Sequence, residues 1–332
     1  MKILLLRRQR LGGTATLSNL IQQTLPEFGL SVDILDADDW IPDRTGGKTD
    51  KEVSKKLREV AKGYHLVHAF GYRCAWACSV AFGLKAPWIY TAHDMPRTTI
   101  PVFIEKLGAA RTGICSSRAV KRALQEGDAT NLDVILPGTP TVESEIGAEA
   151  MKQAKEALGF DPEGRLVLGL GRLVMDHGFD ALANAAQNLT ADVPGLRVVI
   201  AGEGPEAESL HQPGCEVVEG KVDAQQWFTA ADVVVVPHRR CGFSMVAAEA
   251  MALGKPVLAR ETGGLAEMGV RDVSIDLFEA DEDLPYAVMD LLGSSILRES
   301  LGLAARARAY ERFSLRDSVR AYSELYHDLG LR

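Results

Sequence analysis

One carboxylate interrupts an apolar stretch in the second half of the chain, CGFSMVAAEAMALGKP at residues 241–256. Because alanine, methionine, valine and leucine surround Glu249, the stretch predicts a helix that is buried on most of its sides. Ser244 is a suitable N-cap, and the N–H groups of Met245 and Val246 would then point out of the helix start towards an anion. Glu249 lies on the same face and can accept hydrogen bonds from a vicinal diol, such as a ribose offers. The alternative is that Glu249 reaches the surface or pairs with an arginine.

The stretch GLGRLVMDHGFDALANA, residues 169–185, offers a second place for an anion. Arg172 comes directly after an apolar run that predicts a strand, and its forked donors suit phosphate. A solvated surface charge is the alternative for Arg172. His177 can add a positive charge when it is protonated, or it can merely cap the helix that follows.

Paired glycines, Gly12 and Gly13, open a helical pattern in RRQRLGGTATLSNLI. They let the backbone approach a ligand closely, and the N–H groups at a helix start attract an anion, although glycine turns without a ligand are common. The chain has neither a P-loop nor a G-x-G-x-x-G dinucleotide fingerprint, because GLG at 169–171 and GEG at 202–204 lack the third glycine. A two-domain dehydrogenase therefore has no fingerprint behind it.

Short apolar runs alternate with helical patterns along the chain, as in parallel sheets whose strands are connected by helices. The runs predict strands at 2–6, 31–35, 65–69, 87–91, 111–115 and 133–136 and, after a polar segment, at 166–170, 197–201, 216–218, 233–236, 257–259 and 273–277. The chain therefore reads as two doubly wound α/β halves, and ligands in such sheets bind outside the carboxyl ends of the strands. Residues 297–329 predict helices with a break around 313–314 and no further strand.

The composition limits the class of protein. A chain of 332 residues exceeds one ordinary core, so two domains with a cleft are expected. A net charge of −8 disfavours nucleic-acid binding, and the five scattered cysteines form neither a disulfide framework nor a zinc pattern. The longest apolar run near the start, residues 3–6, is too short for a signal sequence or a membrane span, so a cytoplasmic protein is expected. The DAD at 36–38 reads as a strand-end turn and not a metal site, and residues 49–63 read as a solvated helix.

In order and spacing of its motifs, the chain resembles the retaining glycosyltransferases of family 4, the glycosyl transferases group 1. The resemblance is carried by GRLVMDHGFDALANA, VVIAGEGPE, EGKVD and DVVVVPHRRCGFSMVAAEAMALGKPVLARETGGLAEM, and more loosely by LGGTATLSNL, VHAFG, YTAHD and ICSSRAVKRAL. It implies the α/β GT-B fold, in which two Rossmann-like doubly wound domains face each other across a cleft. The acceptor-side domain would span residues 1–140 and the nucleotide-sugar-binding domain 141–313. The similar YERFSLRDSVRAYSELYHDL implies a final helix, 314–332, that covers the first domain.

The resemblance also implies an activity, a hexosyltransferase-like enzyme (EC 2.4) with a UDP- or GDP-linked sugar as donor, no cofactor and no metal ion. Arg172 would hold the phosphates, Glu249 the ribose, and His93 would lie beside the reacting sugar carbon; these three are the expected catalytic residues. Arginine and helix dipoles would stabilise the charge that develops on the departing nucleoside diphosphate. Front-face attack by the acceptor would then retain the anomeric configuration. The expected donor-binding residues are Gly12, Gly13, Arg172, His177, Lys221, Val222, Cys241, Phe243, Ser244, Met245, Val246 and Glu249.

Two positions depart from the family pattern. Cys241 stands where the family has a glutamate, eight residues before the position of Glu249, and His177 stands where it has a lysine. A thiol cannot accept hydrogen bonds from sugar hydroxyls as a carboxylate does. These departures keep two alternatives open, a degenerate sugar-nucleotide-binding protein without transferase activity and a sugar-nucleotide epimerase on the same fold.

The sequence leaves the acceptor open among a carbohydrate, a lipid-linked molecule and a small molecule. A lipid-linked acceptor would bring peripheral contact with the inner face of the membrane. Arg7, Arg8 and Arg10 follow the first predicted strand, and Arg239 and Arg240 precede the helix at 245–252. Such arginines suggest an anionic donor sugar or a phosphorylated acceptor, with five solvated side chains as the alternative.

Overall fold

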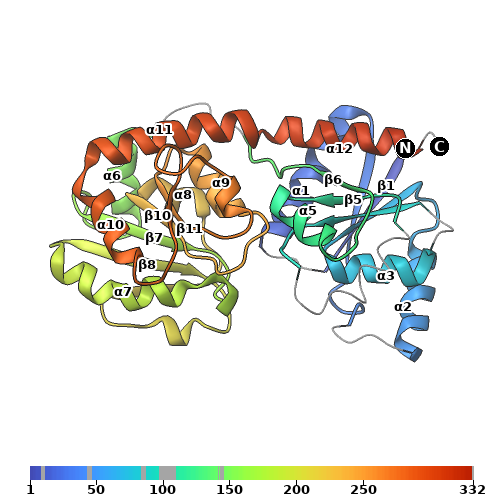
Figure 1. Ribbon diagram of the computed structural model, residues 1–332, viewed down its shortest axis with the longest axis horizontal. Helices are drawn as coiled ribbons and strands as arrows, with labels where there is room; N and C mark the ends of the chain where they lie inside the picture. The colour runs from blue at the N-terminus through green and yellow to red at the C-terminus, as the bar shows by residue number, and fades with distance from the viewer. Residues whose placement is uncertain are drawn as a thin grey trace. The chain divides into compact units, whose positions relative to one another are not determined.

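The structure, a computed structural model, describes residues 1–8, 12–42, 47–83, 87–96, 110–140, 142 and 146–330. It contains two compact units, each with its own parallel sheet. Unit 1 comprises Met1–Gly138 together with Leu315–Arg332, and unit 2 comprises Thr139–Ser314. In Figure 1, each sheet is flanked by helices.

Unit 1 has the strand order β2-β1-β3-β4-β5-β6, and every strand pair is parallel. Every residue of β3 and β4 is buried, which explains why these strands read as continuous apolar runs. The strands are β1 (Lys2–Arg7), β2 (Ser31–Asp36), β3 (Leu66–Phe70), β4 (Trp88–Ala92), β5 (Gly113–Cys115) and β6 (Leu132–Val134). The helices are α1 (Gly13–Thr24), η1 (Leu25–Phe28), α2 (Gly47–Val60), α3 (Tyr72–Phe82), α5 (Arg118–Gln125) and α12 (Leu315–Gly330).

The last helix, α12, belongs to unit 1 although it lies at the far end of the chain. Tyr322 and Tyr326 pack in the same apolar cluster as residues of β1 and β3. The hydroxyl of Tyr326 lies 2.6 Å from Nδ1 of His68, whose Nε2 lies 2.7 Å from Oγ1 of Thr91. Burial lowers the pKa of His68 to about 3, so the ring is neutral and both of its nitrogens have partners. This buried network links α12 to β3 and β4.

Unit 2 has the strand order β12-β11-β10-β7-β8-β9, again with parallel pairs only. At the amino-terminal edge of the sheet, Lys155 Nζ lies 2.7 Å from the buried carboxylate of Asp232. The same carboxylate accepts the N–H of Leu166 at 2.9 Å. The strands are β7 (Arg165–Leu170), β8 (Leu196–Gly202), β9 (Cys215–Glu219), β10 (Val233–Val236), β11 (Val257–Arg260) and β12 (Asp276–Phe278). The helices are α6 (Ala148–Ala157), η2 (Met175–His177), α7 (Phe179–Asp192), η3 (Glu208–Leu210), α8 (Ala224–Ala230), α9 (Met245–Ala252), η4 (Leu265–Glu267), α10 (Leu284–Gly293) and α11 (Ser295–Arg312).

The structure confirms the predicted fold class, two doubly wound α/β halves with parallel sheets, and the strands follow the predicted order. The strand predicted at 273–277 is wrong at its start, because the N–H groups of Val273, Ser274 and Ile275 all bond to the carbonyl of Val270. That tight turn delays the strand until Asp276. No helix in the described part of the chain is long and apolar enough to cross a membrane.

Candidate functional site

The topology of unit 2 creates a place for a ligand at the carboxyl end of β7. The chain continues from β7 to β8 on one side of it and later adds β10 on the other side. Connections that leave neighbouring strands in opposite directions open a crevice outside the carboxyl ends. The predicted Arg172 and His177 follow β7, and the predicted helix α9 follows β10. Figure 1 labels β7, β10 and α9 near one another within unit 2.

The loops after β7 and β10 touch at a glycine. Gly178 has a φ of +66°, and a Cβ atom there would lie 2.3 Å from the carbonyl oxygen of Pro237. No side chain fits at that distance, so glycine is required both for the backbone conformation and for the contact. Two residues before Gly178 and two residues after Pro237, the N–H of Arg239 donates to the carbonyl of Asp176 at 2.9 Å. The two loops are therefore fixed against each other.

Where the two loops meet, the imidazole rings of His177 and His238 stack on each other. The ring centroids of His177 and His238 are 4.1 Å apart with 26° between the ring planes, and Phe179 packs its ring edge-on against His238. His238 is only 6% exposed. Burial lowers its pKa well below the ordinary value, and the charges of His177 and Arg172 lower it further. His177 does not cap α7, because Gly178 is the N-cap of that helix.

The N-terminus of α9 has the geometry expected from the sequence. Ser244 is confirmed as the N-cap, and its hydroxyl accepts the N–H of Ala247 at 3.1 Å. Within the described residues, the N–H groups of Met245 and Val246 have no hydrogen-bond partner. A helix start with unbonded N–H groups carries a partial positive charge, so it suits an anion.

Glu249 lies one turn further along α9 and is half-buried. Burial raises the pKa of this carboxyl group to about 7. No partner of its side chain is found among the described residues, and burial is the cause of its raised pKa, so nothing here supports the alternative of an arginine pair. A partly buried carboxylate without a donor among the described residues can accept hydrogen bonds from the hydroxyl groups of a ligand.

The other predicted residues of unit 2 have different settings. Cys241 is 4% exposed and Phe243 packs its ring against Phe313 at 5.3 Å, so both lie in the interior. Lys221 is exposed and Val222 half-buried, and both follow β9 at the same sheet edge.

In unit 1, the predicted residues also follow strands. Gly12 is the N-cap of α1, with a φ of +86°, and Gly13 is the first residue of that helix. His93 follows β4 and is buried, and its carbonyl accepts the hydroxyl of Ser116 at 2.8 Å. These residues therefore lie beyond the carboxyl ends of strands of the unit 1 sheet.

Three arginines of the arginine-rich site suggested by the sequence already have carboxylate partners. Arg7 is buried and bonds to Asp36, Ser18 and Asn19. Arg239 forms a forked pair with Asp180 and also bonds to Asp281, and Arg240 bonds to Asp176 at 2.7 Å. These guanidinium groups pair with carboxylates inside their own units, so these three residues give no support for an anionic substrate. Arg10 lies outside the described residues.

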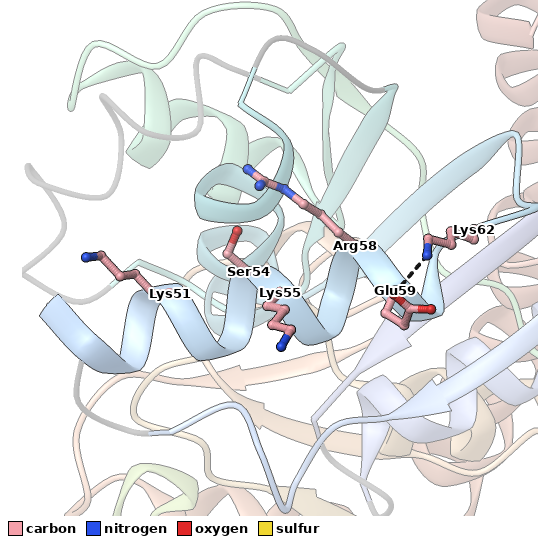
Figure 2. A pocket seen from close by; sticks show the side chains of 6 residues that line it. All are labelled: Lys51, Ser54, Lys55, Arg58, Glu59 and Lys62. Carbon is pink, nitrogen blue, oxygen red and sulfur yellow. Dashed lines mark hydrogen bonds and ion pairs between the residues drawn. The ribbon is translucent and has the colours of Figure 1, made fainter.

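A separate hollow lies on α2 in unit 1, lined by Lys51, Ser54, Lys55, Arg58, Glu59 and Lys62 (Figure 2). Its lysines are exposed, and Lys62 bonds to Glu59 at 2.9 Å. The opposite side of α2 buries Val53 and Leu57. The hollow is the solvated face of a helix, as the sequence predicts for residues 49–63.

Comparison with known proteins agrees with the fold. Residues 164–293 match the family model described as glycosyl transferases group 1. The D-inositol 3-phosphate glycosyltransferase of Xylanimonas cellulosilytica is 33% identical over 227 residues, which cover 61% of this chain and 52% of that protein. Its counterpart in Frankia alni is 32% identical over 273 residues, 70% of this chain and 66% of that protein. The chain thus spans about half to two thirds of the length of these curated relatives.

Two solved structures share the fold along nearly the whole chain. Sucrose-phosphate synthase from Thermosynechococcus elongatus has a TM-score of 0.82 at 19% identity and covers 99% of both chains. HepE of Anabaena, solved in complex with UDP-glucose, has a TM-score of 0.82 at 20% identity and covers 99% of this chain and 100% of its own. The paired doubly wound units define a GT-B protein. Within it, residues 164–293 of unit 2 match the glycosyl transferases group 1 family, which the chain resembles.

Proposed function

We propose that the protein transfers a sugar, with retention of its anomeric configuration, from a nucleoside diphosphate sugar to an acceptor. The observation that carries the proposal is the set of groups at one edge of the unit 2 sheet: Arg172 after β7, the unbonded N–H groups at the start of α9, and the half-buried Glu249. The first two suit a diphosphate and the third suits a ribose. HepE, which shares the fold, was solved with UDP-glucose, and this supports a UDP- or GDP-linked donor.

In the proposed reaction, the bond between the sugar carbon and the diphosphate breaks while the acceptor oxygen bonds to the same face of that carbon. The acceptor proton passes to the departing diphosphate. Arg172 and the N–H groups of Met245 and Val246 stabilise the negative charge where it develops. His177 adds charge when it is protonated. His93 and Gly13 of unit 1 are proposed to face the sugar and the diphosphate, as in the family that the chain resembles.

The direct test is calorimetric titration with UDP- and GDP-linked sugars, followed by NMR of the sugar released from the tightest-binding donor. We expect one donor to bind and to yield a product or free sugar with unchanged anomeric configuration. A product of inverted configuration would overturn the retaining mechanism, and binding without any release of nucleoside diphosphate would overturn the transferase.

The buried Cys241 supports a second candidate, a sugar-nucleotide-binding protein without turnover, because no carboxylate stands at that position. Cys241→Glu, with Cys241→Ser as a size-matched control, separates the two candidates. If wild-type protein releases nucleoside diphosphate and Cys241→Glu loses this activity while still folded, the site is adapted to cysteine. If only Cys241→Glu turns the donor over, the wild-type protein is the binding protein.

A further inference from the structure

His238 lies in unit 2, in the loop that follows β10. It follows β10 by two residues, at the strand end that faces the crevice beside β7. Its side chain is more than nine-tenths buried, and its Nε2 atom has no hydrogen-bond partner among the residues that the structure describes. Buried polar atoms are nearly always paired in proteins, so an unpaired one at a ligand-binding edge points to a ligand atom.

The ring of His238 is held in one orientation. His177 stacks on its face at 4.1 Å, and Phe179 packs edge-on at a centroid distance of 6.2 Å with 89° between the planes. The contact between Gly178 and Pro237 fixes the backbone directly before it, and the bond from Arg239 to Asp176 fixes the backbone directly after it. A side chain packed against two rings and held on both sides of its backbone can present one nitrogen to a ligand without a further loss of side-chain entropy.

The charges around His238 favour an anion. Arg172 lies close enough for its charge to lower the pKa of His238, and so does His177. The nearby carboxylates of Asp176 and Asp180 bond to Arg240 and Arg239. Because burial keeps the His238 imidazole neutral, what it offers a ligand is a hydrogen bond and not a charge.

We propose that His238 is a further donor-binding residue, whose Nε2–H donates a hydrogen bond to the diphosphate beside Arg172 and His177. The inference rests on the proposed function, since it assigns a new contact to the same site. It makes the stacked pair of histidines one binding element, in which His238 supplies a fixed hydrogen-bond donor.

The test uses inorganic pyrophosphate, UDP and GDP as probes in calorimetric titrations of the full chain at pH 7.5. His238→Phe keeps a ring that can stack on His177 but removes both nitrogens. We expect His238→Phe to bind each probe that wild type binds about tenfold or more weakly, as for a lost hydrogen bond to a charged group. His238→Gln, which keeps an N–H donor, should recover part of the affinity. His211→Phe is the matched control, because His211 is an exposed histidine of the same unit, and it should bind like wild type.

A measurement on unmutated protein covers the case in which the substitutions disturb folding. Two-bond ¹H–¹⁵N spectra of the imidazole nitrogens should show the His238 Nε2 signal shifting when pyrophosphate is added. An unshifted signal at saturation, or a folded His238→Phe with wild-type affinity, would overturn the inference and leave the proposed function intact. If wild-type protein binds no probe at all, the proposed function itself fails.

Discussion

Glu249 lets the proposed site be tested through stability alone, without knowing the ligand. The substitution Glu249→Gln keeps the size and polarity of the side chain but removes its ionisation. Burial raises the pKa of this carboxyl group in the folded protein from 4.5 to about 7. The folded protein therefore binds more protons than the unfolded chain between these two pH values, and its stability falls as the pH rises through that window.

The magnitude follows from the two pKa values. Since one pKa unit corresponds to about 1.4 kcal/mol, keeping Glu249 buried costs the folded protein about 1 kcal/mol at pH 5 and about 3 kcal/mol at pH 8. Glu249→Gln does not carry this cost because its side chain does not ionise. Its free energy of unfolding relative to wild type should therefore be roughly 2 kcal/mol larger at pH 8 than at pH 5. For a unit of this size, that difference corresponds to a shift of roughly 4–8 °C in the unfolding midpoint.

The assay is thermal unfolding of wild type, Glu249→Gln and the exposed control Glu208→Gln at pH 5 and pH 8. We expect the advantage of Glu249→Gln to grow with pH while the control shows no such trend. The same variant should bind UDP- or GDP-linked sugars more weakly than wild type, because a neutral amide is a poorer acceptor for the ribose hydroxyls. A Glu249→Gln advantage that is equal at both pH values would refute the account of a buried, unpaired carboxylate.

Three further substitutions test contacts that hold the site loops and each of the two units. Gly178→Ala should lower the unfolding midpoint and weaken pyrophosphate binding, because its Cβ meets a backbone carbonyl; Gly195→Ala, also at positive φ but in open space, should cost stability only and leave binding unchanged. Tyr326→Phe should destabilise the protein by about 1–3 kcal/mol in denaturant titrations, because it strips a partner from a buried imidazole, whereas Tyr310→Phe on the surface should have no effect. Asp232→Asn should cost about 3–5 kcal/mol, because a buried ammonium loses its carboxylate; a cost below 1 kcal/mol would contradict the buried pair.

Much of the fold could be read from the sequence because its strands are buried on both faces. The run VVVV at 233–236 coincides with β10, and β7 and β8 extend only slightly beyond the predicted runs. The turn that delays β12 was not foreseen, because Val273 and Ile275 have strand-forming side chains while their N–H groups bond back to Val270.

For the site, sequence patterns located the loops but not the partners of their side chains. Ser244 could be predicted as a cap because capping is local. Arg239 could not be assigned to Asp180, since the two are 59 positions apart and meet only in the folded unit. His238 was missed for the same reason. Its single signal in the sequence is a histidine two residues after a fully buried strand, and its stacking on His177 requires the loop contact at Gly178.

The central claim is that the carboxyl edge of the unit 2 sheet binds a nucleoside diphosphate sugar. Calorimetric titration of wild type, Arg172→Ala and Glu249→Ala with the tightest-binding UDP- or GDP-linked sugar tests it most directly. The account predicts that wild type binds and that each substitution weakens binding at least tenfold, by loss of a phosphate contact or of the ribose contact. Unchanged affinity in both folded variants would contradict it.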